Sequence, residues 1–202
     1  MKRLIFLAPL FLLALAAAAR AAPIPLAEIS RYLNGLTSAE APFEQINSDG
    51  TTSHGRLYIR RPGRMRFEYA PPDQALVLAS GGQVAVFDGK TGQPPEQYPL
   101  ARTPLNLILA RNIDLTRARM VTGHAESGEF TIVTARDPDH PEYGSLQLAF
   151  SAGPVTLRQW RVTDEAGGVT TVILGPLETG KSYPPSLFSI TAEANKSKRR
   201  RD

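Results

Sequence analysis

Alternation of apolar and charged side chains with a period of two is the feature that most restricts the fold of this chain. In Arg64–Tyr69, the side chains of Met65, Phe67 and Tyr69 fall on one face of an extended backbone, and the charged side chains between them fall on the other. Successive side chains of a β-strand point to opposite faces. This segment is therefore predicted to be an antiparallel strand with one buried face.

Similar short segments recur along most of the chain. Turn pairs such as Pro62-Gly63, Gly81-Gly82 and Gly167-Gly168 separate them. Many short strands without alternating helices indicate one antiparallel sheet, curled into a barrel or an open half-barrel. We expect a mainly β fold, with strands from Phe43 onward and over residues 56–60, 64–69, 75–79, 84–87, 117–122, 129–135, 145–150, 156–163 and 169–174.

Two segments depart from this period and predict helices. Residues 25–36 carry leucine and isoleucine at helical spacing, which indicates a short amphipathic helix. Thr103-Pro104 is a typical helix start, and residues 105–109 after it are apolar nearly all round. A helix this apolar must cover a hydrophobic face. It either closes a cavity or fills the space with its own side chains, and composition does not separate the two.

The first 21 residues have the parts of a secretory signal peptide. Lys2 and Arg3 precede an apolar run that ends in alanines, and we place the cleavage after Ala21. An uncleaved membrane anchor is the less favoured alternative, because the uncharged run is shorter than the roughly 20 residues that span a bilayer. The chain has no cysteine, so it carries no lipid-modified N-terminal cysteine, and its fold closes without disulfides.

The basic residues are concentrated at the two ends of the chain. Residues 22–195 hold 15 Lys and Arg against 18 Asp and Glu, whereas residues 196–202 hold five bases and one acid. The high isoelectric point is therefore no indication of nucleic-acid binding. We expect the basic tail, residues 196–202, to be a disordered solubilising end. The alternative is that it contacts anionic lipid headgroups or an acidic partner.

The sequence offers no constellation of residues typical of catalysis or of cofactor binding. His54, His124 and His140 have no second ligand at metal-binding spacing, and no serine lies in a nucleophile-elbow motif. The carboxylates between Asp137 and Glu142 are interleaved with prolines, as in a solvated loop. We expect neither an enzyme nor a bound metal or other cofactor.

Several motifs, in order, resemble the LolA family of periplasmic outer-membrane lipoprotein carriers. The stretch from Gly55 to Pro72 is similar to the family's G-x-L-x-[IV]-x-R-P strand, followed by an aromatic-rich strand and a proline turn. Phe43-Glu44-Gln45 resembles its first strand, residues 80–88 its next hairpin, and residues 103–109 its TP–LL helix. Met65, where the family commonly has an aromatic residue or leucine, and the basic tail depart from the pattern.

The resemblance implies an open half-barrel with a helical lid over residues 22–195, and a cavity for acyl chains. Its partners would be acylated lipoproteins, an ATP-driven (ABC-type) inner-membrane release complex, and an outer-membrane receptor or the outer membrane itself. The protein would be a periplasmic monomer. By this likeness Arg61 is the residue that holds the lid closed. The cavity-lining residues would be Met65, Phe67, Tyr69, Leu76, Leu78, Leu105, Ile108 and Leu109.

Two other functions fit the same expected fold. A periplasmic regulatory module could use the half-barrel to sense lipid or lipoprotein. It would form stable complexes with a signalling partner instead of handing cargo on. An outer-membrane lipoprotein receptor is disfavoured, because it needs the cysteine that this chain lacks.

Overall fold

A single large antiparallel sheet dominates the computed structural model, which describes residues 22–91, 93–103 and 105–199. The predicted signal peptide, residues 1–21, lies outside the described residues. The strands are β1 (Ser38–Ile46), β2 (Thr52–Arg60), β3 (Arg64–Tyr69), β4 (Leu76–Ser80), β5 (Gln83–Phe87), β6 (Glu96–Pro99), β7 (Val121–Ser127), β8 (Phe130–Ala135), β9 (Ser145–Ser151), β10 (Thr156–Thr163), β11 (Val169–Leu174) and β12 (Glu178–Thr179). The α-helices are α1 (Leu26–Gly35), α2 (Leu105–Leu109) and α3 (Ile190–Arg199), and the short 3₁₀ helices are η1 (Leu100–Arg102), η2 (Pro141–Tyr143) and η3 (Pro185–Phe188).

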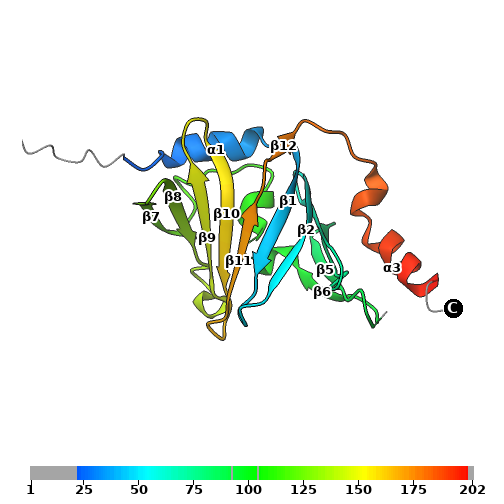
Figure 1. The fold of residues 1–202 in the computed structure, drawn as a ribbon. Helices are drawn as coiled ribbons and strands as arrows, with labels where there is room; N and C mark the ends of the chain where they lie inside the picture. Colours follow the sequence, from blue (N-terminus) through cyan, green and yellow to red (C-terminus); the bar gives the residue numbers. More distant parts are fainter. Residues whose placement is uncertain (1–21, 92, 104, 200–202) are drawn as a thin grey trace, which may run out of the picture.

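The sheet is built from two meanders joined by one long-range pairing. Its order is β6-β5-β4-β3-β2-β1-β11-β10-β9-β8-β7, and β12 pairs with the start of β1. Phe43 on β1 lies opposite Leu174 on β11, which joins the N-terminal and C-terminal halves. The two outer strands, β6 and β7, do not pair with each other, so the sheet curves without closing (Figure 1). The prediction of a mainly β, open half-barrel is confirmed.

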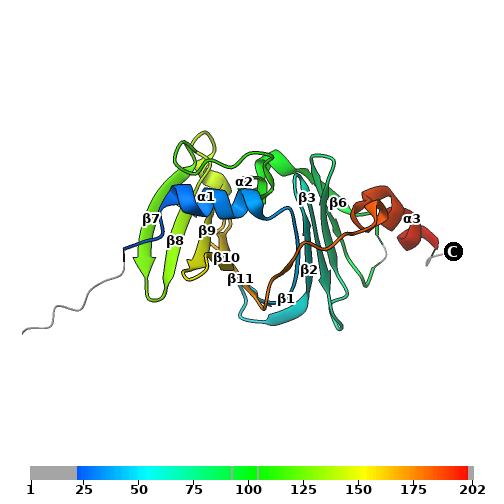
Figure 2. The same cartoon turned by 90° about the horizontal axis from the view of Figure 1, so that it is seen from above.

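Helices α1 and α2 cover the concave face of this sheet. Seen from above, α1 crosses the open side of the curve, with α2 beside it (Figure 2). Their apolar side chains join one large core with the inner faces of the strands; Ile29, Leu33, Leu57, Val133 and Leu148 are all fully buried there. The amphipathic pattern of residues 25–36 thus reflects one helix face laid against the sheet.

A second, smaller core lies on the convex face. Leu78, Ala85 and Phe87 of β4 and β5 are buried there beneath Phe188 of η3, and the side chains of Ile190 and Ala194 on α3 pack against them. Figures 1 and 2 show α3 outside the curved sheet, on the side opposite α1 and α2. The convex face of β4 and β5 is therefore covered, in addition to the part of their concave face that belongs to the large core.

Four expectations about individual elements are corrected. Strand β1 begins at Ser38, earlier than Phe43, and the fully exposed strand β6 was not predicted. Residues 117–120 form turns, and β7 starts only at Val121. The tail was expected to be disordered from residue 196, but α3 continues through Arg199. Within the described residues, no helix is both long enough and apolar enough to cross a bilayer.

Candidate functional site

The guanidinium of Arg61 links the two helices that cover the sheet. Arg61 follows β2 directly, in the turn that leads into β3. Its Nη1 donates a hydrogen bond to the carbonyl of Leu33 in α1, and its Nη2 donates to the carbonyl of Ala110, just after α2, at 2.6 Å. Nη2 also lies 3.4 Å from Oδ1 of Asn34. One side chain thus bridges the ends of both helices.

The carbonyls that Arg61 binds are available because they lie at the C-terminal ends of helices. The last four carbonyls of an α-helix have no partner within the helix, and they carry the negative end of its dipole. A planar, permanently charged group with several donors satisfies two such ends at once. Burial lowers the pKa of Arg61 from its ordinary value, and its Nε has no hydrogen-bond partner among the described residues. The contact therefore has a desolvation cost as well as a gain.

Two further side chains of α1 hold the segment that follows α2. Asn34 accepts a hydrogen bond from the amide of Ile113 at 3.0 Å and donates one to its carbonyl at 2.8 Å. Ser30 accepts from the amide of Leu115 at 2.9 Å. We call α1, α2 and residues 110–115 the lid. Sequence reasoning missed Asn34 and Ser30, although their spacing of four residues places them on the same side of the helix.

Most of the expected cavity-lining residues do meet on the inner face under the lid. Met65 and Phe67 of β3 belong to the same buried core as Ile108 and Leu109 of α2, and Tyr69 and Leu105 pack against it partly buried. Aromatic rings lie edge to face here, with centroids 5.4 Å apart for Phe43 and Phe67, 5.1 Å for Phe43 and Tyr69, and 5.8 Å for Phe67 and Trp160.

Leu76 and Leu78 lie on the opposite face, so their assignment to the same cavity is wrong. The register pairs Phe67 with Val77 and Met65 with Ala79, which places the odd-numbered residues of β4 on the inner face. Leu78 is instead buried in the convex core below η3, and Leu76 packs against that core. Because β4 is apolar at nearly every position, its sequence did not reveal which side faces inward.

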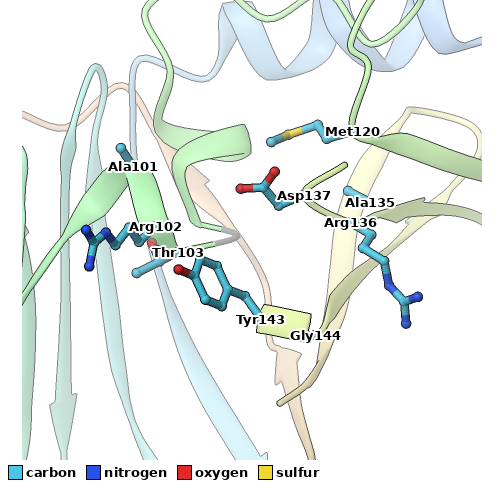
Figure 3. A pocket seen from close by; sticks show the side chains of 9 residues that line it. All are labelled: Ala101, Arg102, Thr103, Met120, Ala135, Arg136, Asp137, Tyr143 and Gly144. Atoms are coloured by element: carbon cyan, nitrogen blue, oxygen red, sulfur yellow. The ribbon is translucent and has the colours of Figure 1, made fainter. Parts of the chain in front are cut away.

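The space beneath the lid is filled largely by the protein's own side chains. Met65, Ile108 and Leu109 are each 1% exposed. A small cavity where η1 faces β8 and η2 measures about 30 Å³. Met120, Asp137 and Tyr143 approach it from one side and Thr103 from the other, while the guanidinium groups of Arg102 and Arg136 point away (Figure 3). This volume suits one water molecule and not an acyl chain. A more open groove of about 380 Å³ lies further along the inner face, where Tyr69, Val77 and Val86 line it. The packed region is therefore the part of the interior directly beneath the lid.

Titratable groups elsewhere form local structural contacts. Asp137 caps its own loop by accepting hydrogen bonds from the amides of Asp139 and His140, and His140 stacks on Tyr143. In the described ranges, no three His, Asp or Glu side chains are grouped to hold a metal ion. At the lid, convergent polar groups lie above the inner apolar core.

Comparison with known proteins points to one family. Its sequence profile, described as outer membrane lipoprotein carrier protein LolA, matches residues 34–191. Three curated relatives are each named an outer-membrane lipoprotein carrier protein. Those of Chromobacterium violaceum and Dechloromonas aromatica are 24% and 28% identical, over 87% and 83% of this chain and 86% and 83% of their own lengths. That of Coxiella burnetii is 29% identical over 68% of this chain, which spans 64% of that relative's length.

Among solved structures, a LolA superfamily protein from Nitrosomonas europaea is similar. The superposition has a TM-score of 0.43 at 10% identity and covers 82% of this chain and 98% of that one.

Proposed function

Because the chain belongs to the LolA family of outer membrane lipoprotein carrier proteins, we propose that it binds the acyl chains of lipoproteins released from the inner membrane and delivers them to the outer membrane. It would work in the periplasm without catalysis. Its partners would be an ATP-driven release complex on one side, and an outer-membrane receptor or the membrane itself on the other.

The observation that carries this proposal is the bridge made by Arg61. Its guanidinium bonds to the carbonyls of Leu33 and Ala110, directly above a core of apolar side chains on a curved, unclosed sheet. Hydrogen bonds to charged groups contribute about 1.5–3 kcal/mol each, and partial exposure reduces this. Bonds of this strength can hold a lid shut in the empty protein and still be broken by an incoming ligand.

Acyl chains supply the free energy to open such a lid. Burying one methylene group yields about 0.8 kcal/mol, so a few methylenes exceed the cost of breaking the Arg61 bonds. Several long chains would bind too tightly for a carrier if the cavity were preformed. The closed, packed interior lowers the net gain, because cargo must displace Leu109 and its neighbours. We propose that binding is reversible because the cost of displacing these side chains offsets part of the free energy gained by burying the acyl chains.

A photo-crosslinking experiment tests the binding site. A photoreactive amino acid is placed at Leu105, which packs against the inner core, or at Leu76, which packs against the convex core. Both positions are partly buried and apolar, so they form a matched pair. After mixing with a synthetic triacylated lipopeptide and irradiation, the inner position should crosslink and the outer one should not. Equal crosslinking from both positions, or none from either, would contradict the proposal.

Transfer separates a carrier from a sensing module on the same fold. Protein loaded with the lipopeptide is mixed with acceptor vesicles of outer-membrane lipids and the receptor, where the host has one. A carrier should release its cargo and become available for a second round. Retention of the lipopeptide together with a stably bound partner would favour the sensing function instead.

A further inference from the structure

The C-terminal helix α3 carries a cluster of positive charge that the carrier mechanism does not use. We call Lys196, Lys198 and Arg199 the basic end of α3; all three are exposed. The match to the family profile ends at residue 191, so the basic end lies beyond the matched part. Arg200 and Arg201 follow in the sequence.

The helix is fixed to the body by specific contacts. Nη1 of Arg66 donates to the carbonyl of Leu187 at 3.0 Å and lies 3.3 Å from Oε1 of Glu193. The Arg66 side chain is only 9% exposed, and its Nε is 2.6 Å from a carboxylate oxygen of Glu68. Ser189 accepts a hydrogen bond from the amide of Ala192 at the start of the helix. The basic end therefore has a defined place on the molecule.

Its charge is mostly uncompensated. Lys196 is 2.7 Å from Glu193, which is shared with Arg66. Lys198 and Arg199 form no ion pair within the part of the chain that the structure describes. Residues 22–195 carry three more acids than bases, opposite in sign to the residues that follow. An anionic surface would thus attract this end and repel the body, which would orient the whole molecule.

We infer that the basic end of α3 is a docking surface for the anionic headgroups of a phospholipid bilayer. Residues 195–199 offer Asn, Lys, Ser, Lys and Arg, with no apolar side chain that could anchor a protein partner in a pocket. Attraction between a few bases and a charged bilayer needs no such anchor, and it is weak and reversible. Figures 1 and 2 show the end of α3 directed away from the sheet and from α1, so docking there leaves the lid free.

Vesicle binding of the purified, unloaded protein tests this inference independently of cargo. The probes are vesicles of phosphatidylcholine alone and of phosphatidylcholine mixed with phosphatidylglycerol. The protein should bind the anionic vesicles at least about tenfold more tightly, and raising the salt to about 0.5 M should remove the difference. The triple variant Lys196→Gln, Lys198→Gln, Arg199→Gln should lose at least about tenfold in binding.

A matched variant separates a docking surface from net charge. Arg117→Gln, Arg158→Gln, Arg161→Gln removes three exposed bases from the other half of the protein, and it should bind like the wild type. Unchanged near-ultraviolet circular dichroism shows that both variants are folded. The inference fails if the wild type does not prefer anionic vesicles, if the α3 variant binds as well as the wild type, or if both variants lose binding equally. Crosslinking of lipopeptide at Leu105 should be the same in all three proteins, so a failure here leaves the carrier proposal intact.

Discussion

At the scale of single residues, Arg61 joins three parts of the chain that lie far apart in the sequence. The guanidinium comes from the turn after β2, and its acceptors lie at the ends of α1 and α2. The amide of Gly63 in the same turn donates to the carbonyl of Leu109 at 2.9 Å. The position of Arg61 was predictable only from a resemblance of motifs. Its role as the residue that holds the lid closed remains a proposal.

Replacing Arg61 by leucine should separate loading from delivery. Arg61→Leu removes the charged bonds that favour the closed state, so the variant should take up lipopeptide at least as well as the wild type. Its delivery to acceptor vesicles should fall by about tenfold or more, because about 1.4 kcal/mol of lost preference for closure is a factor of ten. Fluorescently labelled lipopeptide reports both steps. Arg60→Leu is the control, since the Arg60 guanidinium donates to the carbonyl of Tyr183 outside the lid. Normal delivery by Arg61→Leu would remove Arg61 from this role.

Tyr69 should make the fold sensitive to alkaline pH. Burial raises the pKa of Tyr69 to about 12, and its hydroxyl donates to Oε1 of Gln45 at 2.7 Å. Above about pH 10 the unfolded chain loses this proton while the folded protein keeps it, so the free energy of unfolding falls as pH rises. Tyr69 should contribute up to about 2 kcal/mol of this fall. Urea unfolding between pH 9 and 11.5 should therefore be less pH-dependent in Tyr69→Phe. An equal slope in both proteins would contradict this.

At the scale of elements, the alternation of residue types predicted the strands that have one polar face. In β3 charged residues alternate with Met65 and Phe67, and this alternation identified the face that points inward. In β4 both faces are buried, because α3 and η3 cover the convex side, so the orientation of Leu78 could not be predicted. Strand β6 is fully exposed and has no apolar periodicity. Helix α3 is held by contacts with residues far away in the sequence, such as the ion pair between Arg66 and Glu193. The composition of residues 190–199 alone does not predict such contacts.

The attachment of α3 should depend on Phe188. This side chain is 1% exposed and belongs to the convex core, so Phe188→Ala should cost about 3–5 kcal/mol of local stability. Hydrogen exchange of residues 190–199 should accelerate, while the amides of β1 and β11 stay protected. Val133→Ala, a substitution in the inner core, should leave exchange in α3 as it is. Uniform acceleration across the protein in Phe188→Ala would show that α3 is no separate unit.

At the scale of the whole molecule, we propose that the open sheet and its packed interior together set how acyl cargo would bind. Edges β6 and β7 are not paired, so the sheet can spread without breaking its ladder. The interior side chains must move before an acyl chain can take their place. Each methylene added to the acyl chain would then replace a contact between the protein's own side chains. The gain in binding free energy per methylene should therefore be smaller than the gain for transferring a methylene out of water.

The dependence of affinity on acyl-chain length should show this displacement. A preformed cavity would gain about 0.8 kcal/mol per methylene, or about fourfold in the dissociation constant. For the packed structure we expect the dissociation constant to fall by less than about twofold per methylene across lipopeptides of increasing chain length, measured by calorimetry.

Two variants test whether space under the lid sets this dependence. Leu109→Ala opens space under the lid and should bring the change in dissociation constant towards fourfold per methylene. Leu78→Ala should not, because Leu78 is equally buried but lies in the convex core. A wild-type slope of fourfold would mean that cargo meets an empty cavity, and a slope raised by Leu78→Ala would mean that global loosening, not space beneath the lid, controls uptake.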